Sequence, residues 1–316
     1  MSRLRALLLA LLACGTVLVA GAAPASALSS LKDPPPGAND FSCQPSAAHP
    51  RPVVLLHGLG ATMSENWSYL SPILKREGYC VFALTYGLDP RLPSRGGTIS
   101  VTRSAPEVGA FVDRVLQATG ATQVDFVGHS EGTFTPEYWL KVLGGGPKVH
   151  TYVAWTPLYD GTKLLGVSQL RDLLAPTGLS KLGVDLFNTF CEFCTEVLAG
   201  SDVVRQLNVG GSGTPGVRYT TIMTRYDELV VPYTSGINDR PDATNIVLQD
   251  VCRKNLSEHL LVAVDPAVAR LTLNALDPAN ARPVRCDQPL GAQPAAAKAA
   301  KKRATVKKRA ATKRRG

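Results

Sequence analysis

Short apolar runs alternate along most of this chain with segments whose apolar residues recur every three or four positions. The short runs are typical of buried strands, and the second pattern is typical of helices that cover a sheet. Strands are expected at 52–56, 80–86, 124–127, 150–157, 218–223 and 245–251. Helices are expected at 67–79, 106–120 and 135–145. This alternation predicts an α/β fold with a mostly parallel central sheet flanked by helices.

One apolar segment interrupts the alternation. Residues 164–207 lie between two expected strands and contain the runs LGVSQLRDLL and LGVDLFNTFCEFCTEVL, which have helical spacing. We expect this segment to form a helical cap inserted between strands. Residues 51–290 have the length of one large domain.

The N-terminal region differs from this domain in composition. Residues 1–27 place two arginines ahead of an apolar run and end in the small-residue sequence ASA, which predicts a signal peptide cleaved after Ala27 and a secreted protein. An uncleaved membrane anchor is one alternative, and a lipid-modified Cys14 is another. Residues 28–50 are rich in proline and small residues, which predicts a linker along the surface.

The net charge of +9 belongs to the C-terminal region. Ten lysines and arginines and no acid follow Ala297, so the remaining charge, +9 minus 10, is −1. Residues 291–316 are alanine-rich and lack an apolar face, which predicts a disordered Lys/Arg-rich tail. An anionic cell-envelope or lipid surface would be its partner. The alternatives are a tail without a partner and, disfavoured by export, one that binds nucleic acid.

Six cysteines remain once the signal peptide is removed, and an even number in an exported chain favours disulfides. Six thiols allow 15 pairings. Proximity along the chain suggests three of them: Cys43 with Cys80, Cys191 with Cys194, and Cys252 with Cys286. The CxxC spacing of the middle pair would also suit zinc or redox chemistry, although a second ligand pair is missing.

The motif GHSEG follows the expected strand at 124–127 and precedes an expected helix. Gly128 and Gly132 flank Ser130 in the Gly-x-Ser-x-Gly pattern of a nucleophile elbow, a turn too tight for bulky neighbours. An ordinary polar turn can carry the same letters. The interpretation therefore depends on whether the chain supplies partners for a reactive serine.

A serine hydroxyl needs a base to take its proton and a carboxylate to orient that base. His259, in NLSEHLL after the last expected strand, is the candidate base. Asp227, in the loop after the strand at 218–223, is the candidate acid and gives the chain order serine, acid, histidine. Asp250 and Glu228 are its rivals. Four histidines are excluded by their positions before, within or directly after strands: His49, His57, His129 and His150.

Attack on an acyl group creates a negative oxygen, which needs fixed hydrogen-bond donors. The backbone N–H of Glu131 is one expected donor, because it lies at the start of a helix. The backbone N–H of Leu59, in the loop HGLG after the first strand, is the other. The alternative for HGLG is a glycine turn without this role. This chemistry requires no metal and no organic cofactor.

This ordered set of motifs resembles secreted actinobacterial lipases of the α/β-hydrolase superfamily, of the bacterial class 2 type. The similarity runs from about Pro35 to Pro278 and is carried by PPPGANDFSC, RPVVLLHG, NWSYLSPILKREGYCVFALTYG, FVGHSEG, TRYDELVVPYTSG and the final EHL and DP. It implies the α/β-hydrolase fold, a triad of Ser130, Asp227 and His259, and hydrolysis of carboxylic esters, often of lipids.

Two positions depart from this family. Threonine commonly stands in place of Leu59 and glutamine in place of Glu131, so a hydroxyl donor is lost and a carboxyl group is gained. A carboxylate there must turn away or be paired, because it would oppose the negative oxygen. The expected function is a triacylglycerol lipase with an acyl-enzyme intermediate. The alternatives are a short-chain carboxylesterase or polyester hydrolase and, from another class, a non-catalytic envelope-binding protein.

Overall fold

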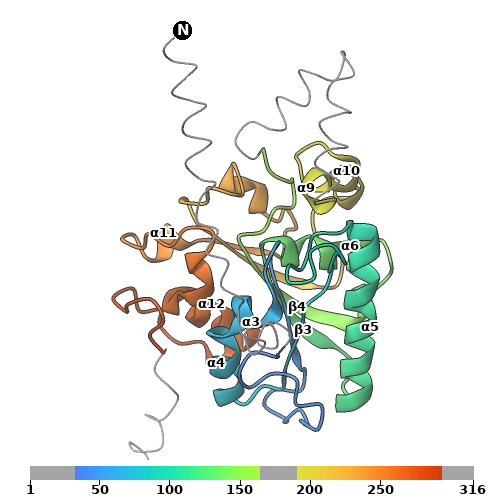
Figure 1. Ribbon diagram of the computed structural model, residues 1–316. Helices are drawn as coiled ribbons and strands as arrows, with labels where there is room; N and C mark the ends of the chain where they lie inside the picture. The colour runs from blue at the N-terminus through green and yellow to red at the C-terminus, as the bar shows by residue number, and fades with distance from the viewer. Residues whose placement is uncertain (1–32, 164–190, 294–316) are drawn as a thin grey trace, which may run out of the picture.

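The computed structural model describes residues 33–163 and 191–293. A six-stranded sheet in the order β2-β1-β3-β4-β5-β6 forms its centre, and all neighbouring strands in it are parallel (Figure 1). The strands are β1 (Val53–Leu56), β2 (Val81–Leu84), β3 (Val124–His129), β4 (Val149–Trp155), β5 (Arg218–Met223) and β6 (Thr244–Val247). The predicted α/β fold with a parallel central sheet is confirmed.

Helices cover both faces of the sheet (Figure 1). One face packs against α3 (Met63–Trp67), α4 (Leu70–Arg76) and α12 (Pro266–Leu276), and the other against α5 (Val101–Thr119) and α6 (Thr135–Lys141). Successive strand residues point to opposite faces. Val53 and Leu55 accordingly pack on the face covered by α3, α4 and α12. Val54 and Leu56 pack on the face covered by α5 and α6.

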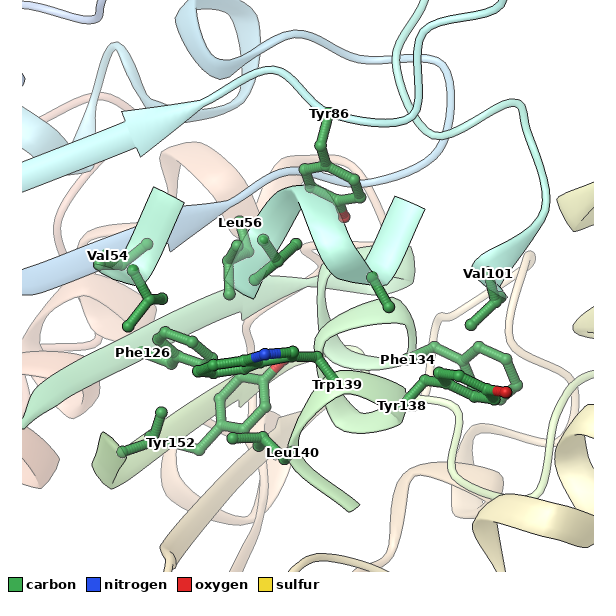
Figure 2. Close-up of a cluster of buried hydrophobic side chains, with 14 of the residues drawn as sticks. Val54, Leu56, Tyr86, Val101, Phe126, Phe134, Tyr138, Trp139, Leu140 and Tyr152 are labelled. Carbon is green, nitrogen blue, oxygen red and sulfur yellow. The ribbon is translucent and has the colours of Figure 1, made fainter. Parts of the chain in front are cut away.

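Aromatic side chains fill the core between the sheet and α6. Figure 2 shows Trp139 of α6 lying across Phe126 of β3, with Tyr152 of β4 beneath them. The ring centroid of Phe126 lies 6.0 Å from that of Trp139 and 5.3 Å from that of Tyr152. Because α6 follows the turn after β3, this packing gives that turn a rigid base.

Short elements complete the described part of the chain. They are α9 (Phe193–Glu196), α10 (Asp202–Leu207), α11 (Leu248–Val251) and the 3-10 turns η1 (Ser130–Thr133), η2 (Gly146–Lys148), η5 (Tyr233–Gly236), η6 (Leu261–Val264) and η7 (Pro278–Asn280). None of the helices in residues 33–163 and 191–293 combines the length and apolar character needed to cross a membrane.

The prediction of a strand over 245–251 is partly wrong. The strand β6 ends at Val247, and the next four residues form the helical turn α11. Leu248 and Cys252 are both buried and lie four residues apart, which places them on one face of a helical turn. An apolar run of this length fits a strand and a helical turn equally well, and core packing decides between them.

The expected helices also have different bounds, and the one expected at 135–145 ends at Lys141 as α6. The segment expected as one helix at 67–79 contains the end of α3 and the whole of α4. A capping box between Thr62 and Glu65 starts α3 before Trp67. The helix expected at 106–120 begins at Val101 and contains Pro106. Val101 and Ala105, one turn apart, are buried and extend its apolar face.

The three disulfides suggested by proximity are present: Cys43–Cys80, Cys191–Cys194 and Cys252–Cys286. Pairing of Cys191 with Cys194 takes both thiols away from the zinc alternative. Most of the expected cap, residues 164–190, lies outside the described residues, as do the expected signal peptide and residues 294–316 of the expected tail.

Candidate active site

Ser130 lies directly after β3, in a turn that requires glycine on both sides. Its φ of 55° is in the left-handed region, which is uncommon for residues other than glycine. A Cβ atom on Gly128 would lie 2.0 Å from the Gly132 carbonyl oxygen, and one on Gly132 would lie 2.0 Å from the Leu56 carbonyl oxygen. The turn therefore has the strained geometry of a nucleophile elbow.

His259 and Asp227 form a buried pair at the same edge of the sheet. His259 Nδ1 lies 2.9 Å from Asp227 Oδ1 and 3.0 Å from Oδ2, and both side chains are nearly inaccessible to solvent. A carboxylate only accepts hydrogen bonds, so Nδ1 carries the proton of the neutral imidazole and Nε2 is left as a base. Asp227 Oδ1 also accepts the N–H groups of Leu229 and Val230, at 3.0 and 2.7 Å.

The two rival acids have other partners. Asp250 is exposed on α11 and accepts a 2.6 Å hydrogen bond from Arg225. Glu228 accepts a 3.4 Å hydrogen bond from the backbone N–H of His259, away from its imidazole. Asp227 is thus the acid that the structure places on the imidazole of His259.

Ser130 and His259 both line one pocket. Its walls are mainly apolar, with Leu158, Phe193, Val197, Leu229, Val230 and Leu260 among the lining residues. Phe193 and Val197 come from the end of the expected cap, and Phe193 packs edge-on against Phe134, next to the elbow. The arrangement suits an apolar group bound beside a reactive serine.

The expected oxyanion donors lie next to Ser130. Leu59 lines the same pocket, and Glu131 is the second residue of the 3-10 turn η1, whose first N–H groups have no partners within the turn. The loop after β1 approaches the serine closely, because a Cβ atom on Gly58 would lie 3.1 Å from Ser130 Cβ. Backbone donors from two loops therefore flank the serine.

The Glu131 side chain turns into the protein interior. It is fully buried, Oε1 accepts a 3.1 Å hydrogen bond from Thr135, and Oε2 has no partner among the described residues. Burial raises the pKa of this carboxyl group well above its usual value. Burial therefore favours the neutral form of Glu131, which is compatible with a negative oxygen at Ser130.

A buried polar network in the wall of the pocket could not be predicted from the sequence. Asn66 Oδ1 lies 3.0 Å from both the Gly58 N–H and His129 Nδ1, and His129 Nε2 lies 2.9 Å from the His259 carbonyl oxygen. Burial lowers the pKa of His129 to about 3 and that of His57 to about 4, so both rings are neutral. No local sequence signal marks Asn66, since its partners come from other loops.

Comparisons with known proteins agree with this arrangement. The model of the family described as Lipase (class 2) matches residues 50–271. A curated protein named triacylglycerol lipase, from Pseudarthrobacter phenanthrenivorans, is 30% identical over 151 residues, which are 45% of this chain and 43% of that protein.

A solved structure of lipase B from Aspergillus fumigatus matches with a TM-score of 0.58 at 16% sequence identity. The match covers 87% of this chain and 64% of that one. The chain thus spans less than two thirds of the length of both relatives. At this identity the structural likeness shows the fold alone, and it confirms the expected α/β-hydrolase fold.

Proposed function

Because this chain belongs to the class 2 lipase family, a family of carboxylic ester hydrolases, we propose that it is a secreted serine hydrolase of lipid esters, triacylglycerols among them. One observation carries the proposal: Ser130 and His259 line one apolar pocket, and the Asp227 carboxylate accepts a hydrogen bond from His259 Nδ1. That arrangement supplies a nucleophile, a base and an orienting acid.

In the proposed mechanism, His259 Nε2 takes the proton of Ser130 Oγ as Oγ attacks the ester carbonyl carbon. The N–H groups of Leu59 and Glu131 stabilise the negative oxygen of the tetrahedral intermediate. His259 then donates its proton to the departing alcohol and leaves an acyl group on Ser130. Water, activated by the same imidazole, releases the acid, while Asp227 stabilises the imidazolium in both steps.

The lining of the pocket supports an acyl chain as the bound group. Aliphatic and aromatic side chains form most of its wall, and an alkyl chain gains about 0.8 kcal/mol for each methylene removed from water. The name of the curated relative, triacylglycerol lipase, agrees with this choice.

Secretion is supported by two independent features. The first 27 residues have the composition of a signal peptide. The described residues contain three disulfides, which persist in oxidising compartments.

The test of the mechanism is a set of four variants assayed on a soluble ester. Ser130→Ala and His259→Ala should each lower kcat by about 10⁴ to 10⁶-fold, because the triad acts as a unit, and Asp227→Asn should lower it somewhat less. Asp250→Asn is the matched control and should leave kcat unchanged. A folded Ser130→Ala variant with the parent rate would refute the mechanism, and a strong loss only in Asp250→Asn would reassign the acid.

The substrate class needs a separate measurement. Cleavage of emulsified long-chain triacylglycerols is expected, and efficient cleavage of acetyl and butyryl esters without it would reassign the protein as a short-chain esterase. A fluorophosphonate probe should label Ser130 covalently. Absence of labelling in the folded protein would favour the non-catalytic envelope-binding alternative.

A further inference from the structure

The two peptide groups on either side of Gly58 are held by side chains. The His57 carbonyl oxygen accepts a 2.8 Å hydrogen bond from the Tyr86 hydroxyl, and the Gly58 N–H donates to Asn66 Oδ1 at 3.0 Å. The Gly58 carbonyl oxygen lies 2.9 Å from His57 Nδ1 and also accepts a 3.2 Å hydrogen bond from the Ala61 N–H. The fourth polar group, the Leu59 N–H, has no hydrogen-bond partner in residues 33–163 and 191–293, and Leu59 lines the pocket.

The contacts of His57 fix which ring nitrogen carries its proton. The backbone N–H of Tyr86 lies 3.2 Å from His57 Nε2 and can only donate, so Nε2 is the acceptor. Burial lowers the pKa of His57 to about 4, which leaves one proton on the ring near pH 7. That proton is on Nδ1 and is donated to the Gly58 carbonyl oxygen.

The ring of His57 has little freedom to move. It stacks on the Tyr86 ring at a centroid distance of 4.4 Å. On another side it fills the space beside Gly96, where a Cβ atom would lie 2.5 Å from His57 Cε1. The hydrogen bond to Gly58 therefore starts from a fixed donor.

Planarity of the peptide group carries this restraint to Leu59. The Gly58 carbonyl and the Leu59 N–H belong to one trans peptide group, in which the two bonds point in opposite directions. We propose that His57 is a positioning residue: by holding the Gly58 carbonyl in the interior, its Nδ1–H aims the Leu59 N–H at the negative oxygen formed on the Ser130 adduct. Leucine has no side-chain donor, so the orientation of this N–H determines what residue 59 contributes. The inference rests on the proposed function.

Two substitutions of His57 separate its two hydrogen bonds. In His57→Asn the amide nitrogen can take the place of Nδ1 and donate to Gly58. In His57→Gln the amide oxygen can take the place of Nε2 and accept from Tyr86, but the side-chain donor to Gly58 is lost and only the 3.2 Å hydrogen bond from the Ala61 N–H remains. On a soluble p-nitrophenyl ester, His57→Gln should lower kcat by about 10 to 100-fold with KM nearly unchanged, since loss of a whole oxyanion donor costs about 10² to 10³-fold. His57→Asn should keep most of kcat.

A boronic acid that forms a tetrahedral adduct with Ser130 provides a second readout. Its Kd should rise in His57→Gln by the factor lost from kcat and should rise much less in His57→Asn, because the adduct carries the oxygen that the Leu59 N–H binds. Thermal unfolding is measured in parallel. Equal kcat values for the two folded variants, or losses that follow the folded fraction alone, would overturn the proposal.

Tyr86→Phe decides the matter if neither His57 variant folds. It removes one oxygen atom and the hydrogen bond to the His57 carbonyl, and it should lower kcat by roughly 3 to 10-fold at constant KM, the equivalent of one net hydrogen bond. An unchanged kcat would overturn the restraint on this loop. If the unaltered protein neither cleaves the ester nor reacts with a fluorophosphonate, the proposed function fails instead.

Discussion

Glu131 directly follows Ser130, and its side chain is fully buried. The pKa of its carboxyl group is raised from 4.5 chiefly by burial, so the native protein holds a proton that the unfolded chain releases. Wherever the native state binds more protons, the free energy of unfolding falls as pH rises. The window for Glu131 begins at about pH 4.5 and extends upward to its native pKa.

Glu131→Gln should remove this dependence on pH. The variant should match the parent in free energy of unfolding near pH 4 and exceed it by about 1.4 kcal/mol more for each pH unit above 4.5, up to the native pKa. Urea unfolding at several pH values measures the difference. Asp113→Asn, at an exposed position, controls for the removal of one negative charge. Parallel curves for Glu131→Gln and the parent would show that Glu131 is ionised in the native state.

The sequence predicts the candidate catalytic residues around Ser130 but not the surroundings of every side chain there. Ser130, Asp227 and His259 could be singled out because each lies in a loop directly after an expected strand, and the carboxyl ends of parallel strands share one edge. The environment of the Glu131 carboxyl group could not be predicted. It is set by Gly97, where a Cβ atom would lie 1.6 Å from Glu131 Oε2, and this contact joins segments that are distant in the chain.

The N-terminus of α5 is capped by side chains from α9 and from the residue that precedes α9. Ser100, its N-cap residue, makes no side-chain capping bond. Instead, the N–H of Ser100 donates to Glu192 Oε2 at 2.9 Å, and the N–H of Val101 donates to Glu196 Oε2 at 2.7 Å. These carboxylates satisfy donors left free by the helix and lie at the positive end of its dipole. The pocket wall formed by α9 is thereby attached to α5.

Removal of this cap should destabilise the protein. Glu196→Ala should lower the free energy of unfolding by about 1 kcal/mol, as for the loss of other N-caps. Glu196→Gln, which keeps the acceptor oxygen without the charge, should fall between this variant and the parent. Asp202→Ala, on the exposed first turn of α10, is the control and should change stability by less than about 0.5 kcal/mol. Equal effects of the Ala variants in urea unfolding would contradict the capping role.

The sequence predicts a strand or helix correctly where its hydrophobic pattern fits only one of the two. The strand ending at Leu56 was recognised because its apolar run stops at a glycine turn. The run at 245–251 predicts a strand throughout, although its second half forms α11, because burial of Leu248 and Cys252 on one helical face is a tertiary effect. The capping box of Thr62 and Glu65 is visible in the sequence and marks the start of α3.

The basic tail acts at the scale of the whole molecule. Ten positive charges follow Ala297, and their attraction to an anionic surface extends over about 8 Å at physiological salt. Truncation after Ala297 should weaken retention on anionic vesicles, most visibly at low salt, and should leave kcat on a soluble ester unchanged. Neutral vesicles are the control. Equal retention of both forms on anionic vesicles at low salt would leave the tail without this role.

Exposed leucines in the segment that carries His259 favour contact with a lipid surface. Leu260 lines the pocket and is 62% exposed, and Leu256, three residues before His259, is 70% exposed. Full transfer of a leucine side chain from water to an apolar phase contributes about 1.5 to 3 kcal/mol, or roughly a factor of 10 to 100 in affinity. A few such residues would hold the pocket against an emulsion droplet.

Leu256→Ser should therefore lower the rate on emulsified triacylglycerol by about 10-fold, because less protein is bound at the droplet surface. Its rate on a soluble ester should stay unchanged, since Leu256 is not among the residues that line the pocket. Leu143→Ser is the matched control. Leu143 is 47% exposed and follows α6 shortly before β4 begins, at the sheet edge opposite Ser130. Equal losses in both variants on the emulsion would show that general surface hydrophobicity, and not the exposed leucines near His259, governs adsorption.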